Sequence, residues 1–173
     1  PSSRAIDGMI SYWTFDEGSG TTAFDSFGDN HGTIYGPTWT TGIVDDALSF
    51  DGVDDYVNVG NDTTLTNLTP TGMAIEAWVF NTEPIPTDIG GYNKSIVTQR
   101  EGFSKGYGLE YGFQPAVDWG HFVWIGFYFG YEGIANYEIK ANEWYHIVGV
   151  FEDDLATIYI NGIGQETWSR GLF

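Results

Sequence analysis

Apolar residues alternate with small or polar residues along most of the chain, at the period of two that is typical of strands with one buried face. Clusters of Gly, Asn, Asp, Ser and Pro separate the alternating segments and predict turns. No segment keeps the 3.6-residue period of a long amphipathic helix. The pattern therefore predicts an all-β chain, with strands at residues 10–15, 33–35, 47–50, 53–59, 73–80, 95–99, 107–113, 122–131, 144–152, 157–161 and from 165 onward.

Three features refine this prediction. Residues 73–80 are apolar on both faces, with Ile75, Ala77 and Val79 on one side and Glu76, Trp78 and Phe80 on the other, as expected in the middle of a sandwich. Residues 38–41 are expected to be a connection, and residues 60–70 a surface loop anchored by Leu65 and Leu68. Asn161-Gly162 predicts a type I′ hairpin turn.

An acidic turn lies between the strands predicted at residues 47–50 and 53–59. Asp51, Asp54 and Asp55 fall within five residues, and Gly52 lets the backbone turn tightly. The three carboxylates repel one another unless water, a cation or a basic group offsets them, and no Lys or Arg is near them in sequence. The turn is therefore the first candidate site.

Residues 49–57 (SFDGVDDYV) resemble the signature turn of laminin-G-like, concanavalin A-like jelly-roll domains of the laminin G 3 type. Other segments resemble the same family in the same order along the chain: residues 12–26, 30–34, 75–79, 143–150 and 158–162. The resemblance implies a two-sheet antiparallel jelly-roll sandwich, in a single domain over residues 1–173 excised or processed from a longer chain. Domains of this family end in a closing strand that has no counterpart here, which implies either truncation or a sheet edge that a neighbouring chain completes.

The balance of acidic and basic residues limits the classes of molecule that the chain could bind. The 173 residues include 24 Asp and Glu against 6 Lys and Arg, a formal net charge of −18, and no Cys. Nucleic acid and anionic membranes attract positive charge, so this balance argues against both. It is compatible with divalent cations, neutral glycans or a high-salt environment, and a halophilic source is an alternative explanation. The family resemblance implies an extracellular or cell-surface location.

Calcium is the cofactor that the acidic residues favour, because Ca²⁺ takes six to eight oxygen ligands at flexible geometry. The resemblance implies a site in which the first loop folds over the acidic turn, with ligands from Asp25, Asn30, Asp51, Asp54 and Asp55. The spacing does not match an EF-hand. The alternative interpretation is that these side chains form Asx-turns and solvate the loops.

No catalytic residues are predicted. Glycoside hydrolases need two carboxylates that flank one bond, and no Glu-x-Asp-x-x-Glu spacing occurs, while Glu76 stands alone on its strand. His31, His121 and His146 are scattered.

Aromatic residues gather in the second half of the chain and suggest a sugar-binding platform, because apolar sugar faces stack on aromatic rings. The candidates for ligand binding are Tyr107, Tyr111, Trp119, His121, Trp124 and Tyr128. Alternation places Phe122, Trp124 and Tyr128 on one face of their strand. The alternative is that most of these rings belong to the core.

Together these observations predict a non-enzymatic, calcium-stabilised extracellular recognition module that binds a glycan or a protein surface. A structural or adhesive subunit whose open sheet edge is completed by a neighbouring chain is the alternative. A carbohydrate-active enzyme of the same fold ranks third.

Overall fold

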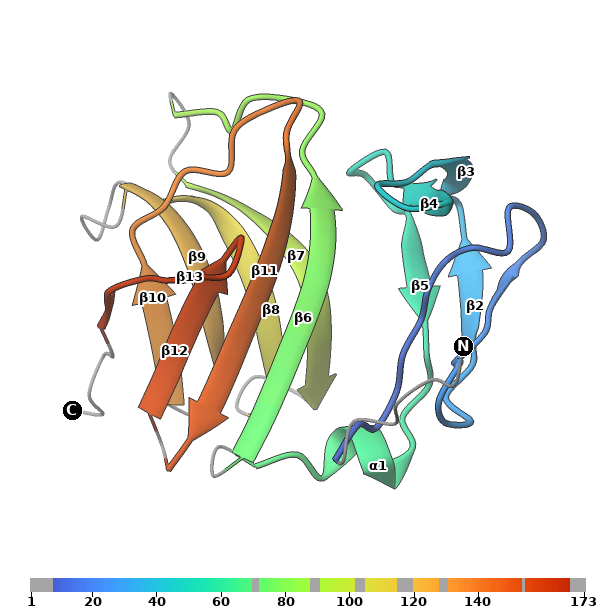
Figure 1. The fold of residues 1–173 in the computed structure, drawn as a ribbon, viewed down its shortest axis with the longest axis horizontal. Helices are drawn as coiled ribbons and strands as arrows, with labels where there is room; N and C mark the ends of the chain where they lie inside the picture. Colours follow the sequence, from blue (N-terminus) through green and yellow to red (C-terminus); the bar gives the residue numbers. More distant parts are fainter. Residues whose placement is uncertain are drawn as a thin grey trace. The chain divides into compact units, whose positions relative to one another are not determined.

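The computed structural model describes residues 8–69, 72–87, 91–101, 105–114, 120–127, 131–153 and 155–168. It is mostly β, as predicted, and its strands form four antiparallel sheets (Figure 1). The chain divides into two compact units, Pro1–Asn67 (unit 1) and Leu68–Phe173 (unit 2). The single domain expected over residues 1–173 stays a prediction.

Unit 1 holds five short strands and the four-residue helix α1 (Thr63–Thr66). One sheet has the order β1-β2-β5, and β3 and β4 form a separate pair. The bounds are β1 Thr22–Ala23, β2 Gly32–Tyr35, β3 Thr38–Thr41, β4 Asp46–Ser49 and β5 Tyr56–Asn58. Asp62 begins α1 by accepting the backbone N–H of Thr64, and Leu65 is buried as expected. Among the described residues no helix is long and apolar enough to cross a membrane.

Two predictions for unit 1 are wrong. Residues 10–15 make one isolated bridge, between Trp13 and Asp25, instead of a strand, and Phe15 has a positive φ of 57° that breaks the extended conformation. Residues 38–41 form β3, which pairs with β4, instead of a connection. Thr and Trp favour strands, so the composition of residues 38–41 suits the pairing that the structure shows.

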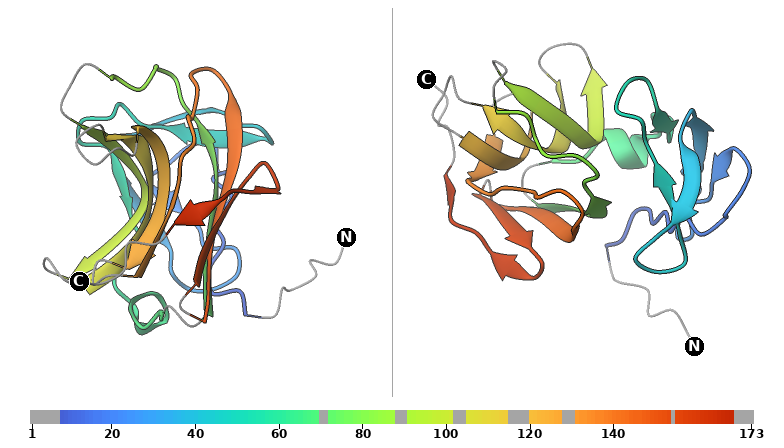
Figure 2. Two further views of the ribbon diagram at one scale, coloured as in Figure 1. Left: turned by 90° about the vertical axis from the view of Figure 1, so that its left-hand side faces the viewer. Right: turned by 90° about the horizontal axis from the view of Figure 1, so that it is seen from above.

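Unit 2 is a sandwich of two sheets, seen edge-on in Figure 2. One sheet has the order β14-β10-β9-β8-β7 and the other β13-β12-β11-β6. The bounds are β6 Gly72–Phe80, β7 Tyr92–Glu101, β8 Lys105–Gln114, β9 Gly120–Phe127, β10 Tyr131–Ala135, β11 Trp144–Glu152, β12 Leu155–Ile160, β13 Ile163–Gly164 and β14 Thr167–Trp168. The segment predicted as one strand at residues 122–131 is thus divided between β9 and β10.

The core of unit 2 lies between these sheets. Alternate residues of β11 are buried, including Tyr145, Ile147 and Phe151, and they join Leu109 and Ile125 of the opposite sheet in one cluster. The hairpin turn at Asn161 and Gly162 has φ values of 51° and 78°, which confirms the type I′ prediction.

β6 occupies a different place from the one expected. It pairs with β11 over its full length, from Phe80 opposite Trp144 to Gly72 opposite Glu152, but it ends the order of its sheet. The expectation of a central strand is therefore wrong for the part of the chain that the structure describes. The apolar outward side chains of β6 are exposed instead of covered: Trp78 is 52% exposed and Phe80 40%.

Candidate functional site

The acidic turn brings three of the predicted metal ligands together. One carboxylate oxygen each from Asp51, Asp54 and Asp55 lies within 4.8 Å of the others, in the connection between β4 and β5. Asp55 Oδ2 accepts the backbone N–H of Asp51 at 2.8 Å, and Asp51 Oδ1 accepts that of Val53 at 2.8 Å. Gly36 packs so closely on the Asp55 carboxylate that a Cβ atom there would collide with it. The turn is therefore closed by its own side chains.

Asp25 and Asn30 lie at the other end of β2. Because Tyr35 pairs with Tyr56, the acidic turn adjoins the Tyr35 end of that strand, whereas Ala23 pairs with Gly32 and leads to Asp25 beyond the opposite end. A four-residue strand separates its ends by about 10 Å. The structure therefore does not bring all five predicted ligands to one point.

Asp25 instead organises its own loop. Its Oδ1 accepts the backbone N–H groups of Tyr12, Phe27 and Gly28 at 2.9 to 3.0 Å, and its Oδ2 accepts that of Asn30 at 3.2 Å. Burial alone would raise the pKa of Asp25, but the amides of Tyr12, Gly28 and Phe27 and the Ser11 hydroxyl lower it to about 2. This pattern matches the Asx-turn interpretation.

Asn30 ties this loop to helix α1. Its side-chain Nδ2 donates to Ser11 Oγ at 2.8 Å and to Thr64 Oγ1 at 3.1 Å, while its backbone carbonyl accepts the indole N–H of Trp13 at 2.8 Å. The amide nitrogen of Asn30 is therefore engaged in holding unit 1 together.

The donor set of the acidic turn suits Ca²⁺. Carboxylate oxygens are hard ligands, and one oxygen each of Asp51 and Asp55 accepts a backbone amide. Within the described part of the chain, no hydrogen bond is formed by Asp51 Oδ2 or by either carboxylate oxygen of Asp54. Three Asp residues supply fewer oxygens than Ca²⁺ requires, so water and backbone carbonyls would complete the shell.

The structure places the predicted aromatic platform mostly in the interior. Tyr107 and Tyr111 are 6% and 4% exposed and belong to the core of unit 2, and Trp124 is 7% exposed. Phe122 and Trp124 lie on the same face of β9, as the alternation predicted, and they form a buried cluster with Ile134. Trp119 and Tyr128 lie outside the described residues.

Trp124 is fixed in place on β9. Its indole N–H donates to Glu132 Oε2 at 2.8 Å, and its ring lies where a Cβ atom at Gly126 would be. A sugar would have to displace this packing in order to stack on the ring. Burial of Tyr107, Tyr111 and Trp124 therefore matches the alternative of packed rings better than a binding platform.

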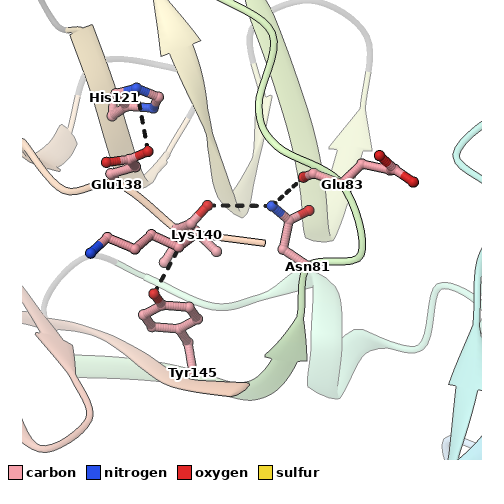
Figure 3. Close-up of polar contacts among 7 residues, drawn as sticks. Asn81, Glu83, His121, Glu138, Lys140 and Tyr145 are labelled. Atoms are coloured by element: carbon pink, nitrogen blue, oxygen red, sulfur yellow. Dashed lines mark hydrogen bonds and ion pairs between the residues drawn. The ribbon is translucent and has the colours of Figure 1, made fainter. Parts of the chain in front are cut away.

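The remaining candidate, His121, lies near a buried polar network at the ends of the strands (Figure 3). Its Nε2 is 4.0 Å from Glu138 Oε1, and its ring contacts Phe113. In the same network the side-chain nitrogen of Asn81 donates to the carbonyls of Glu83 and Ile139, at 2.6 and 3.3 Å. Its Oδ1 accepts from Lys94 Nζ at 2.9 Å and from the Tyr111 hydroxyl at 3.3 Å.

Burial of Lys94 lowers the pKa of its amine, and the nearby charge of Glu83 opposes that shift. Every partner of Asn81 is a group of the chain itself. The network therefore joins the connection after β6 to residues 136–143, which is a structural role.

A second group of aromatic side chains lies on the outward surface of β6, β11 and β12, which we name the aromatic face. Trp78 stacks on His146 with ring centroids 4.9 Å apart, and Phe80 packs against Trp144 at 5.3 Å. Glu76 Oε2 lies 3.4 Å from His146 Nε2. Tyr159, 38% exposed, is paired with Val148, which is paired with Glu76. The aromatic face consists of Glu76, Trp78, Phe80, Trp144, His146 and Tyr159.

The sequence contained a signal for this face. Residues 76, 78 and 80 alternate with the buried residues of β6, so their shared outward direction was predictable. The pattern could not predict that these side chains are exposed to solvent. A row of apolar outward side chains also occurs in strands that are covered on both faces.

Comparison of the sequence with models of known protein families identifies the family of this chain. The family model Laminin_G_3, described as the concanavalin A-like lectin/glucanases superfamily, matches residues 51–170. The match begins at the acidic turn and continues through unit 2. Neither the comparison with curated proteins nor that with solved structures gave a match. Because the family model covers more than half of the chain, the chain belongs to the laminin G 3 family of the concanavalin A-like lectin/glucanase superfamily.

Proposed function

We propose that this chain is a non-catalytic extracellular recognition module that binds a neutral glycan on the aromatic face. The observation that carries the proposal is the exposed Trp78, stacked on His146 beside the Phe80 and Trp144 pair. Large aromatic side chains gathered on a surface typically mark a binding site. The lectin-like family and its common extracellular location support the same role.

The chemistry of the face favours sugars. Aromatic rings offer apolar surfaces to the C–H groups of a pyranose, and Glu76, His146 and the Tyr159 hydroxyl offer hydrogen bonds to its hydroxyls. Residues two apart along a strand are about 7 Å apart, so the Trp78 and Phe80 rows give two contact points along an extended chain. β6, β11 and β12 carry no Lys or Arg, and the net charge is −18, so acidic glycans would be repelled.

The acidic groups on this face are poorly placed for hydrolysis. Glu76 lies opposite Val148, whereas Glu152 lies opposite Gly72, four residues away along β6. That separation is about 13 Å along the strand, compared with roughly 5 to 9.5 Å between the carboxyl groups of glycoside hydrolases. The face therefore favours binding over turnover.

A glycan array followed by calorimetry on the best neutral ligand tests this proposal. We expect Trp78→Ala to weaken binding at least about tenfold, about 1.4 kcal/mol, because stacking surface is lost. Tyr56→Ala is the matched control, since Tyr56 is a half-exposed stacked aromatic in unit 1 and should leave affinity unchanged. Binding that survives Trp78→Ala and Trp144→Ala would contradict the site. Release of reducing ends from any bound polysaccharide would contradict the non-catalytic assignment.

Calcium stabilisation is part of the proposal. The three carboxylates of the acidic turn repel one another in the folded state, and a divalent cation would remove that repulsion. In this role the ion would hold the connection between β4 and β5 and take no part in sugar contacts.

Self-assembly is the second candidate function. It is favoured by the position of β6 at the end of its sheet, where a long strand has a partner on one side only among the described residues.

A further inference from the structure

Two tyrosine rings stack on the exposed surface of the β1-β2-β5 sheet in unit 1. Tyr35 ends β2 and Tyr56 begins β5, and the two residues lie directly opposite each other in the ladder. Their ring centroids are 4.8 Å apart, and the ring planes differ by 20°. Tyr35 is 46% exposed and Tyr56 is 50% exposed. Cross-strand pairing therefore holds two phenol rings face to face where solvent reaches both.

No other pair of tyrosines in the described part of the chain combines these two properties. Tyr137 and Tyr145 meet edge to face, at 6.1 Å and 80°, and Tyr145 is buried. Tyr12 and Tyr159 are exposed, but neither ring stacks on a second aromatic ring among the described residues. Stacking and exposure together therefore single out the pair between β2 and β5.

A covalent link at this place would compensate for the small core of unit 1. The buried hydrophobic side chains within residues 8–67 are those of Ala23, Ile34, Pro37 and Leu65. The chain contains no Cys, so no disulfide can form the link. Small structural units with a limited core are commonly stabilised by covalent cross-links. A bond between two tyrosine rings would have the same effect.

We propose that Tyr35 and Tyr56 form an oxidative cross-linking site, at which hydrogen peroxide, acting through a peroxidase, joins the two rings by a carbon–carbon bond. Each phenol loses the hydrogen atom of its hydroxyl, while the peroxide is reduced to two molecules of water. A ring carbon next to the C–O bond of one phenoxyl radical bonds to its counterpart in the other. The hydrogen atom on each of these carbons then moves to the phenoxyl oxygen, so both hydroxyls are restored.

The geometry favours coupling within one chain. Phenoxyl radicals combine when their ring carbons come into contact, and the stack brings the two rings together before oxidation begins. A second chain would have to reach the same ring by diffusion, against the repulsion between two copies that each carry a net charge of −18. The expected product is therefore a cross-linked monomer.

The bond would enclose residues 36–55, which contain the paired strands β3 and β4 and the acidic turn. Gly36 and Asp55, the immediate neighbours of the two tyrosines, already pack closely on each other. A cross-link stabilises chiefly by reducing the conformational freedom of the unfolded chain. Oxidation should therefore stabilise unit 1 and hold the acidic turn beside β2. This modification is separate from glycan binding, since the aromatic face belongs to unit 2.

Peroxidase treatment of the purified full chain gives the test. The chain is incubated with a haem peroxidase and an equimolar amount of hydrogen peroxide, and the monomer is isolated on a denaturing gel. We expect dityrosine fluorescence in this monomer, a mass lower by two hydrogen atoms, and a cross-linked peptide that contains residues 35 and 56. The yield should not fall when the protein is diluted, because coupling within a chain does not depend on its concentration.

Three conservative variants assign the bond. Tyr35→Phe and Tyr56→Phe keep the stacked rings but remove one phenol each, so either change should abolish the fluorescence of the monomer. Tyr12→Phe removes an equally exposed phenol of unit 1 and is the matched control, which should retain the full signal. After oxidation the wild type should melt at least about 5 °C higher, whereas treated Tyr35→Phe should not.

A small photochemical oxidant, tris(bipyridyl)ruthenium with persulfate, repeats the experiment without an enzyme that must approach the rings. Absence of dityrosine from the monomer with both oxidants would overturn the proposal. Dityrosine found only in dimers would overturn it as well, and so would monomer fluorescence that survives Tyr35→Phe.

Discussion

The carboxylate of Asp25 accepts the backbone N–H of Tyr12 at 2.9 Å, joining segments thirteen residues apart in unit 1. The same carboxylate is a hydrogen-bond acceptor for the backbone amides of Phe27 and Gly28. These donors favour the ionised form, which is why the pKa of Asp25 falls to about 2 from an ordinary 3.8 despite burial. Ionisation of one side chain is therefore coupled to the folding of this loop.

We expect this coupling to appear in acid. A depressed folded-state pKa gives stability that is present above about pH 4 and is lost as the pH falls toward about 2. The shift corresponds to roughly 2 kcal/mol, at 1.36 kcal/mol per pKa unit. Urea unfolding of the wild type and of Asp25→Asn from pH 7 to 2 should show a gap that narrows in acid. Asp29→Asn, an exposed change in the same loop, is the control, and a gap that stays constant down to pH 2 would contradict the prediction.

Gly149 of β11 faces Ile125 of β9 across the core of unit 2. A Cβ atom at residue 149 would collide with the Ile125 side chain, so the absence of a side chain lets the sheets approach. We expect Gly149→Ala to lower the free energy of unfolding by about 1 to 3 kcal/mol through overpacking. Gly72→Ala adds the same methyl group where nothing lies within 4 Å and should change stability by less than about 0.5 kcal/mol.

A double-mutant cycle identifies the cause. Ile125→Val removes the Cδ1 atom that the new methyl group would meet, so it should be less destabilising in the Gly149→Ala background than in the wild type. Additive effects of the two changes would show that the sheets do not meet at this contact.

Calcium should raise the melting temperature at low ionic strength, and EDTA should lower it again. Stabilisation by a bound ion is about 2.7 kcal/mol when its concentration is one hundred times the dissociation constant. Asp54→Asn should abolish the effect, because it removes a carboxylate of the acidic turn. Asp153→Asn removes the same charge at the turn after β11 and should retain the response. Equal melting temperatures in calcium and in EDTA would show that this turn does not bind calcium.

The alternation of side chains predicted the local structure where one face of a strand is buried. It located β6, β11 and β12 and separated Ile75 and Val79 from Trp78 and Phe80, since a period of two assigns residues to faces. Asn161-Gly162 predicted its turn because few other pairs accept two positive φ values.

The same pattern could not locate the site. Tyr107, Tyr111 and Trp124 were candidates for a platform because they are aromatic, but their burial depends on which sheet faces them, and alternation does not contain that information. Asp25 was grouped with the acidic turn by the family resemblance, whereas the pairing of β1, β2 and β5 places it at the other end of β2. Strand pairing joins distant segments and is set by tertiary packing.

The ring of Trp124 occupies the space where a side chain at residue 126 would lie. The residue that evolution can accept at position 126 therefore depends on the residue at position 124. A side chain can enter at residue 126 only if the indole at residue 124 is first exchanged for something smaller, and that exchange leaves Glu132 without its donor. Homologues of this chain that carry a side chain at residue 126 should therefore lack tryptophan at residue 124.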